Sequence, residues 1–284
     1  MTLHDVAQRI GEIEAIDQVA GPLARTAKKL IPPGALKDLL SGSRIGHPLH
    51  PALTDVPIGS FVAATVLDLV GGRRSQDAVQ ALLALGIVTT LPTATAGLAD
   101  WSDTYGPEQR IGVVHALSNV AALSLFAGSL AARRSGRTGL GRMLGLAGMT
   151  TLGAGGYLGG HLSYSRGVGV NNAFYQHEPE DWTAVMEAGD LQAGSPTRVE
   201  ADGATILLYR ASDRIHAIGS RCSHAGGPLQ EGKIDDGALC VECPWHGSVF
   251  SLEDGTVIHG PASIPQAAYD VRVQGGRIEV RARR

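Results

Sequence analysis

This chain has little net charge. It contains 24 Lys and Arg against 27 Asp and Glu, so the formal net charge is only −3 over 284 residues. Outside the flanks of its apolar segments it has no basic run with interleaved aromatic residues, and such runs are the usual footprint of nucleic-acid binding. We therefore expect no nucleic-acid partner.

Charged side chains are missing altogether from three long segments in the first two thirds of the chain. These segments are Ala78–Leu98, Ile111–Ala132 and Met143–Leu162. Each has about 20 residues, the length of a helix that spans a bilayer core. A fourth segment, Leu53–Val70, is interrupted by Asp55 and Asp68. A water-soluble bundle of Ala-rich helices is the alternative, but the uncharged runs and arginine-rich breaks favour four membrane-spanning helices in the cell membrane, with the lipid bilayer as partner.

A cleavable signal peptide is not recognisable at the N-terminus. The leader instead carries Ile10, Ile13, Ile16 and Val19 at near-helical spacing, which is typical of an amphipathic helix. Such a helix lies on a membrane surface or packs against a partner. A solvated helical leader is an equal alternative.

Arginines gather at one end of the predicted bundle, and they bear on its orientation. The face opposite to the C-terminal region holds Arg73, Arg74, Arg133, Arg134, Arg137 and Arg142. The positive-inside rule makes their face cytoplasmic. The leader shares the other face and has basic residues of its own, which weakens this inference. The balance slightly favours a C-terminal region on the non-cytoplasmic side.

Histidines and one aspartate mark the other end of the bundle. With four spans, the start of the first and third and the end of the second and fourth share one membrane face. The residues near these positions are His47, His50, Asp100, His115 and His161. Ionisable groups at such depth are functional candidates, and two imidazoles from facing helices suit a b-type haem. A quinone site, a divalent metal at His50, Asp100 and His115, and a purely structural role stay open.

Cysteine is scarce, and two of the three cysteines share short loops with histidines. Cys222 is followed by His224, and Cys243 by His246. A [2Fe–2S] cluster with two Cys on one iron and two His on the other needs this set. Tetrahedral zinc is the alternative, but zinc fingers usually pair Cys with Cys and His with His. Cys240 alternates with apolar residues in an extended run, so we expect it to be a buried strand residue.

The sequences C-S-H-A-G-G-P-L at 222–229 and C-P-W-H-G-S-V-F at 243–250 resemble the two cluster-binding loops of Rieske ferredoxins. The resemblance covers residues 181–284 and implies one [2Fe–2S] cluster per chain. Its ligands would be Cys222, His224, Cys243 and His246. Gly260-Pro261-Ala262 resembles the proline loop that covers the cluster in such domains.

The same resemblance bears on the redox potential. Rieske proteins of quinol-oxidising complexes carry two more loop cysteines that form a disulfide, and those positions are Gly227 and Trp245 here. Phe250 stands near the position of a tyrosine in the high-potential proteins, while Ser248 retains a hydroxyl that can donate to the cluster. Fewer hydrogen bonds to the sulfurs imply a potential in the lower part of the Rieske range.

The whole chain is predicted to be multidomain, with an all-α transmembrane helical bundle followed by an all-β Rieske [2Fe–2S] domain. Short apolar runs separated by turn residues, such as Ala204–Tyr209 and Arg214–Ile218, indicate the strands. The sequence G-H-P-L-H-P-A-L-T-D-V-P-I-G resembles the signature of a bacterial membrane-domain family of unknown function, often fused to Rieske domains. The expected parts are a leader at 1–46, a four-helix membrane bundle at 47–166, a linker at 167–180 and the Rieske domain at 181–284.

A Rieske domain serves electron carriers and oxygenases. Oxygenases of this family carry a large catalytic domain after the Rieske domain, whereas this sequence stops at Arg284, and we assign no catalytic residue. We predict a membrane-bound electron carrier that exchanges electrons with a redox partner protein or the quinone pool, and not a self-contained enzyme. The alternatives are a redox sensor and an electron-donating component of an oxygenase whose catalytic subunit is a separate chain.

Overall fold

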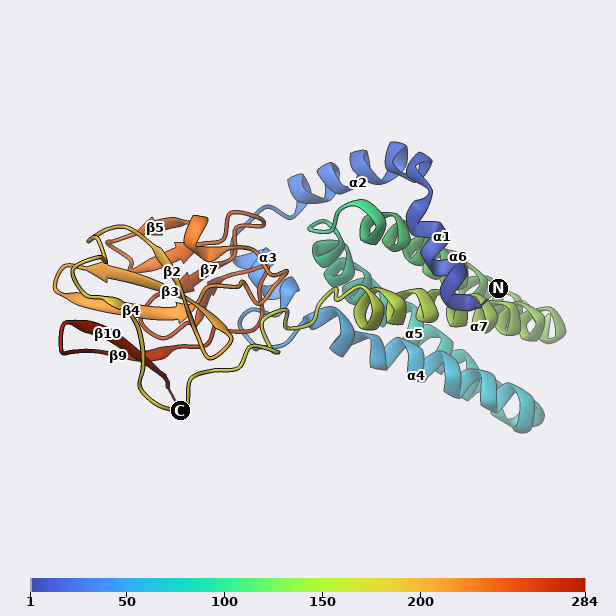
Figure 1. The fold of residues 1–284 in the computed structure, drawn as a ribbon. Coiled ribbons are helices and arrows are strands. Elements are labelled where there is room, and N and C mark those ends of the chain that lie inside the picture. The colour runs from blue at the N-terminus through green and yellow to red at the C-terminus, as the bar shows by residue number, and fades with distance from the viewer. Residues whose placement is uncertain (1, 284) are drawn as a thin grey trace. The chain divides into compact units, whose positions relative to one another are not determined.

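Figure 1 shows the computed structural model of the chain, which describes residues 2–283 and only the backbone of residue 73. The chain forms two compact units. The helical unit contains Met1–Ile31 and Leu49–Val168, and the β unit contains Pro32–Pro48 and Gly169–Arg284. The leader expected over residues 1–46 is therefore divided between the two units, and most of the expected linker belongs to the β unit.

A local sequence signal explains where the first helix of the helical unit begins. Thr2 accepts a hydrogen bond from the Asp5 N–H while the Asp5 carboxylate accepts one from the Thr2 N–H, a capping box at the first helix. The helices described in this unit are α1 (Leu3–Glu12), α2 (Asp17–Leu30), α4 (Leu49–Val70), α5 (Gln76–Trp101), α6 (Gly106–Arg134) and α7 (Thr138–Gly160), with short helical turns at Glu14–Ile16, Gly72–Ser75 and His161–Ser165.

Two helical hairpins, α4–α5 and α6–α7, form the body of the helical unit (Figure 1), and each makes far more contacts within itself than with the other. The rings of Phe61 on α4 and Phe126 on α6 stack with centroids 3.9 Å apart. Behind each ring lies a glycine of the same hairpin. A Cβ on Gly86 would come within 2.5 Å of Phe61, and one on Gly148 within 3.1 Å of Phe126. Glycine at these positions lets the helices of each hairpin pack closely.

The four predicted membrane segments correspond to α4, α5, α6 and α7. Among the described residues, three helices are long and apolar enough to cross a bilayer, namely α4, α5 and α6. The 23 residues of α7 include many glycines, which contribute little apolar surface. Association of this unit with a membrane follows from these helices.

A buried ion pair changes the interpretation of one predicted flanking arginine. The Arg133 side chain is 1% exposed and donates through both terminal nitrogens to the Asp68 carboxylate. Arg142 also donates to the backbone carbonyl of Asp68. Arg133 thus neutralises Asp68, one of the two aspartates that interrupt the segment Leu53–Val70, so it is not a free charge at a membrane surface.

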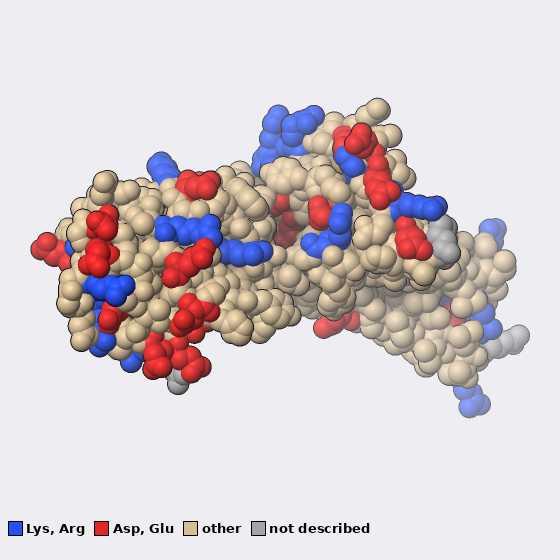
Figure 2. All heavy atoms as spheres, in the orientation of Figure 1, with Lys and Arg blue, Asp and Glu red and all other residues tan. Residues whose placement is uncertain are grey.

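The β unit confirms the all-β prediction for the C-terminal region, and its three sheets are entirely antiparallel. The sheet orders are β1-β10-β9, β2-β3-β4 and β5-β6-β7-β8. The strands are β1 (Thr183–Glu187), β2 (Thr197–Ala201), β3 (Ala204–Ala211), β4 (Arg214–Gly219), β5 (Lys233–Asp235), β6 (Cys240–Glu242), β7 (Val249–Ser251), β8 (Val257–His259), β9 (Tyr269–Gln274) and β10 (Arg277–Ala282). Acidic and basic side chains are interspersed over this unit in the face shown in Figure 2.

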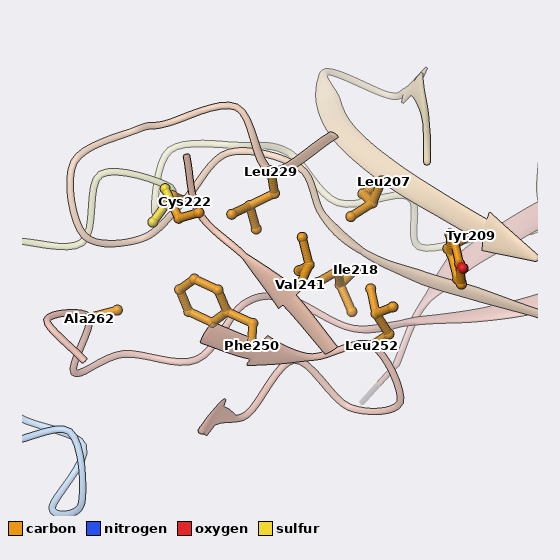
Figure 3. Packing of buried hydrophobic residues seen from close by; sticks show 10 residues of the cluster. Leu207, Tyr209, Ile218, Cys222, Leu229, Val241, Phe250, Leu252 and Ala262 are labelled. Atoms are coloured by element: carbon orange, nitrogen blue, oxygen red, sulfur yellow. The ribbon is translucent and has the colours of Figure 1, made fainter. Parts of the chain in front are cut away.

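A compact apolar cluster supports the loops that follow β4 and β6. Leu229, Val241 and Phe250 are fully buried in it. Figure 3 shows Cys222 at one end of this cluster, with Tyr209 at the other. The Tyr209 hydroxyl donates to Asp236 at 2.5 Å, and this bond raises the pKa of Tyr209 to about 12. The cluster fixes the base of the loops because buried side chains pack without room to shift.

Two segments distant in sequence from the strands also belong to the β unit. Helix α3 (Ala35–Ser41) brings the buried Asp38 carboxylate to the Gly260 N–H at 2.8 Å and to His259 Nδ1 at 3.0 Å. Ser43 donates to the Ala262 carbonyl at 2.7 Å. In the expected linker, the Gln176 side chain accepts from the Thr205 N–H and hydroxyl. Both segments are therefore hydrogen-bonded parts of this unit.

Candidate metal centre

Two loops with the same backbone pattern carry the predicted cluster ligands. The Cys222 N–H donates to the Gly227 carbonyl at 2.8 Å, and the Cys243 N–H donates to the Ser248 carbonyl at 2.8 Å. The Cys carbonyls accept in turn from Gly226 and Gly247, whose φ angles are +77° and +73°. Only glycine adopts such positive φ angles at little cost. Each loop is thus closed on itself by backbone hydrogen bonds.

The four predicted ligand side chains meet between these loops. Cys222 and Cys243 are buried, and their side chains hydrogen-bond each other. The His224 and His246 rings lie with centroids 4.9 Å apart and planes at 83°, and both residues are only half-buried. The sulfur ligands therefore point into the domain, while the imidazoles lie toward its surface.

Backbone donors prepare this site for thiolate. The hydrogen bond from Cys222, together with the N–H groups of Trp245 and His246, lowers the pKa of Cys243 to about 6 against the opposing effect of burial. The pKa of Cys222 is raised because its thiol donates that hydrogen bond. The Cys222–Cys243 pair therefore carries one negative charge readily. This suits iron binding, because iron requires deprotonated cysteine.

The side chains fit a [2Fe–2S] cluster of the Rieske kind. Two thiolates and two imidazoles are the donors that this cluster takes, one kind for each iron, and Nδ1 of His224 is buried in the site. Within residues 2–283, no three or more His, Cys, Asp or Glu side chains converge to hold one metal ion. The four predicted side chains would supply two protein ligands to each of two irons.

Gly227, Ser248 and Phe250 lie at the positions that bear on the redox potential of Rieske proteins, and the structure shows what each of them contacts. A Cβ on Gly227 would lie 2.9 Å from Cys243 Sγ and 3.2 Å from Trp245, so the tryptophan occupies the space beside this glycine. The buried Ser248 Oγ accepts from the Ala262 N–H at 2.9 Å, a bond that uses its oxygen and not its hydroxyl hydrogen. Phe250 lies fully buried in the apolar cluster.

Cys240, expected to be a buried strand residue, is the first residue of β6 and is half-buried.

Asn172, in the expected linker, supports the first ligand loop, and the sequence analysis did not identify it. Its N–H donates to the Ser223 carbonyl at 2.9 Å and its side chain to the His224 carbonyl at 2.8 Å. In the sequence Asn172 is only one polar residue among others in this segment. Its place beside the ligand loop depends on the tertiary structure.

The histidines that were predicted to share one end of the bundle lie in different environments. His50 on α4 and His115 on α6 come together, with ring centroids 6.4 Å apart. His161 is buried in a π-helical turn, and its ring lies 5.2 Å from that of His4. His47 is exposed, belongs to the β unit and has Nδ1 2.9 Å from the Pro48 carbonyl. Asp100 lies near the end of α5.

The residues that position His50 and His115 were also missed in the sequence. His50 Nδ1 lies 2.9 Å from the Thr93 carbonyl, and His115 Nδ1 lies 2.8 Å from the Gly155 carbonyl. One turn beyond each carbonyl is a glycine, Gly97 or Gly159, that faces the imidazole. The signal that would have identified them is the matched spacing of these positions in α5 and α7.

Comparisons with known proteins agree with this arrangement. The Rieske [2Fe-2S] domain family matches residues 181–270, and the predicted membrane protein family DUF2231 matches residues 46–172. The ferredoxin CarAc of Metapseudomonas resinovorans is 34% identical over 100 residues, which are 35% of this chain and 92% of that protein.

Two further relatives are components of dioxygenases. The 3-phenylpropionate/cinnamic acid dioxygenase ferredoxin subunit of Escherichia coli (strain K12) is 36% identical over 89 residues, covering 31% of this chain and 82% of that protein. The solved ferredoxin of carbazole 1,9a-dioxygenase from Nocardioides aromaticivorans IC177 is 33% identical, with 37% of this chain and 100% of that chain covered and a TM-score of 0.35. Through its β unit, the chain belongs to the Rieske [2Fe–2S] ferredoxin family, and it joins this domain to a DUF2231 membrane domain.

Proposed function

We propose that this protein is a membrane-bound electron carrier whose low-potential Rieske cluster passes single electrons to a separate redox partner. The exposure of the ligands carries this proposal. Both cysteines are buried whereas both histidines are half-buried, so the histidines would hold their side of a cluster nearer to solvent than the cysteines. Trp245 beside them is 55% exposed and offers an aromatic surface on which a partner can dock.

The cluster would supply one-electron chemistry at Cys222, Cys243, His224 and His246. The chain's own residues hold these ligands, exclude water from the sulfurs and leave the imidazole edges accessible. The glycine at 227 and the phenylalanine at 250 remove two features of the high-potential proteins, so the potential belongs to the lower part of the Rieske range. A redox titration of purified protein that gave a strongly positive potential would contradict this assignment.

The function can be tested by electron delivery to the full chain in its membrane. We expect a quinol, or a soluble reductase with its nicotinamide donor, to reduce the cluster reversibly. Trp245→Ala is expected to slow transfer to the partner while the cluster's EPR spectrum is preserved, and Trp182→Ala is the matched control in the same unit. Binding to a partner that depends on cluster state, without electron turnover, would identify a redox sensor instead.

A second candidate is supported by the relatives, two of which are ferredoxin components of dioxygenases. In this function the protein would donate electrons to an oxygenase on a separate chain. The helical unit would add a fixed place in the cell membrane, with four passes and the Rieske domain on the non-cytoplasmic side. It would also offer a haem or quinone as electron donor, with His47, His50, Asp100, His115 and His161 as candidate ligands. Reporter fusions after α5 and α7 would test the topology.

A further inference from the structure

The two hairpins of the helical unit repeat one pattern of residues. Asp68 and Arg133 are separated by 65 residues along the chain, and the same interval separates His50 from His115 and Phe61 from Phe126. A second constant interval relates Gly86, Thr93 and Gly97 on α5 to Gly148, Gly155 and Gly159 on α7. The hairpins are therefore two copies of one arrangement.

Each pair of matched residues on α4 and α6 meets across the two hairpins. Asp68 and Arg133 form the buried ion pair at one level, and Phe61 and Phe126 stack at the next. The third level, roughly 16 Å along the helices from the stacked rings, holds His50 and His115. In the first two pairs, the side chains contact each other directly. At the histidine level the ring centroids stand 6.4 Å apart with planes at 88°.

Both imidazoles are held in the same way by the partner helix of their own hairpin. Nδ1 of each ring lies within 2.9 Å of a backbone carbonyl, which can only accept a hydrogen bond. The proton therefore sits on Nδ1, and the Nε2 lone pair of each ring can bind another group; in this structure the Asn119 side-chain nitrogen lies 3.2 Å from that of His115. Metal-binding histidines are usually oriented in this way. The facing glycines are required because a Cβ on Gly97 would lie 2.8 Å from His50, and one on Gly159 would lie 2.9 Å from His115.

We propose that His50 and His115 are the two axial ligands of a b-type haem held between the α4–α5 and α6–α7 hairpins. Metal–imidazole bonds are about 2 Å long, so two imidazoles on opposite sides of one iron have ring centroids roughly 6 Å apart. A haem brings four nitrogen ligands of its own and needs only two more from the protein. The pair matches this requirement in number, distance and protonation.

Other occupants fit less well. A divalent ion needs more than two protein ligands, and within residues 2–283 no third His, Cys, Asp or Glu joins the pair. A quinol bridging the two rings through opposite hydroxyls, with hydrogen bonds of about 2.8 Å each, would hold the nitrogens roughly 11 Å apart. Rings with centroids 6.4 Å apart are too close for that. Asn119 has its side-chain nitrogen 3.2 Å from His115 Nε2 and must turn away when iron binds.

The haem assignment itself is independent of the Rieske cluster, while a role for the haem as electron donor rests on the proposed function. The test uses full-length protein expressed with excess haem precursor and purified from membranes. We expect a pyridine-haemochrome spectrum of haem b at one haem per cluster. Because the imidazole planes are perpendicular, the ferric haem should give the highly anisotropic low-spin EPR signal of such ligation, and the reduced cluster its own separate signal.

Variants make the test specific. His50→Ala and His115→Ala are expected to lose the low-spin haem, whereas His177→Ala, at an exposed position of the β unit, keeps it. Gly159→Ala should lower haem content, while Gly156→Ala, where a Cβ meets nothing within 4 Å, should not. Asn119→Ala is expected to retain haem. The cluster signal in the same samples shows that each variant is folded.

Wild-type protein with a cluster signal and no haem b would overturn the proposal, as would unchanged low-spin haem in both histidine variants. Haem without a cluster signal would instead contradict the proposed Rieske function and leave the axial pair supported. A quinone found by extraction, with no haem, would likewise overturn the haem assignment.

Discussion

The two units of this protein hold their candidate ligand side chains in opposite ways. In the β unit, each cysteine–histidine pair lies on one short loop that closes on itself through backbone hydrogen bonds. In the helical unit, His50 and His115 come from helices of different hairpins, and each is held by a carbonyl of a third or fourth helix. The first kind of site depends on local conformation, and the second depends on helix packing. Different substitutions should therefore disrupt the site in the β unit and the site in the helical unit.

The largest expected effect is at the cluster itself. Cys243→Ser should remove the [2Fe–2S] cluster, because serine does not replace thiolate as an iron ligand of comparable strength. Cys240→Ser is the matched control, since Cys240 lies outside the ligand set and should leave iron content unchanged. Iron analysis and EPR of both purified variants measure this. Equal cluster loss in the two variants would contradict the ligand assignment.

The folding stability of the helical unit should decrease when its buried ion pair is broken. Arg133→Met leaves the Asp68 carboxylate buried without its partner, a change that costs about 3–5 kcal/mol in folding free energy. Arg134→Met is the control because Arg134 is exposed. Thermal unfolding in detergent, followed by circular dichroism at helical wavelengths, checks the loss, and visible absorbance reports the cluster separately. The double variant Asp68→Leu with Arg133→Met should recover most of the stability. No recovery would show that the pair does more than neutralise charge.

A smaller effect is expected where α3 meets the proline loop. Asp38→Ala leaves the buried Gly260 N–H without its acceptor, which costs about 1–3 kcal/mol. Asp38→Asn keeps one acceptor oxygen and should lose less. Hydrogen exchange at Gly260, together with the temperature at which cluster absorbance is lost, measures both changes. Unchanged exchange in Asp38→Ala would mean that α3 does not stabilise this loop.

The smallest effect is a pH dependence of the β unit. The pKa of His216 is lowered by burial and then by Arg214, with Glu253 opposing and Arg283 adding to the shift. As pH falls below about 6.5, the unfolded chain takes up this proton before the folded one. The free energy of unfolding should therefore decrease in acid and be fully restored above that pH. Denaturant titrations from pH 7.5 to about 5.5 should show a shallower decrease in His216→Gln, and an identical slope would exclude His216 as the cause.

Much of the β unit was predictable because its signals are local. The hairpin predicted from Ala204–Tyr209 and Arg214–Ile218 is confirmed by β3 and β4. The two ligand loops follow from their own residues, since glycine at 226 and 247 permits the positive φ angles that close them. The contribution of Asp38 was not predictable, because it lies over two hundred residues from the loop that it contacts.

In the helical unit, sequence indicated the apolar segments but not how they pair. Periodicity and charge locate a helix, whereas the facing of His50 and His115 depends on which glycines let neighbouring helices approach. The buried position of Arg133 was missed for the same reason, because an arginine next to a break looks like a flanking charge until its partner is known.

The sequence by itself determined the cluster chemistry, since two thiolates and two imidazoles on self-closing loops need no distant contact to define their donors. It also determined the membrane character of the first unit, because uncharged segments of bilayer length carry that information locally. Only the tertiary structure decided that α3 and Asn172 support the cluster loops and that two histidines, 65 residues apart like the ion pair, face each other. Those features arise from contacts between distant segments, which the order of residues along one segment does not encode.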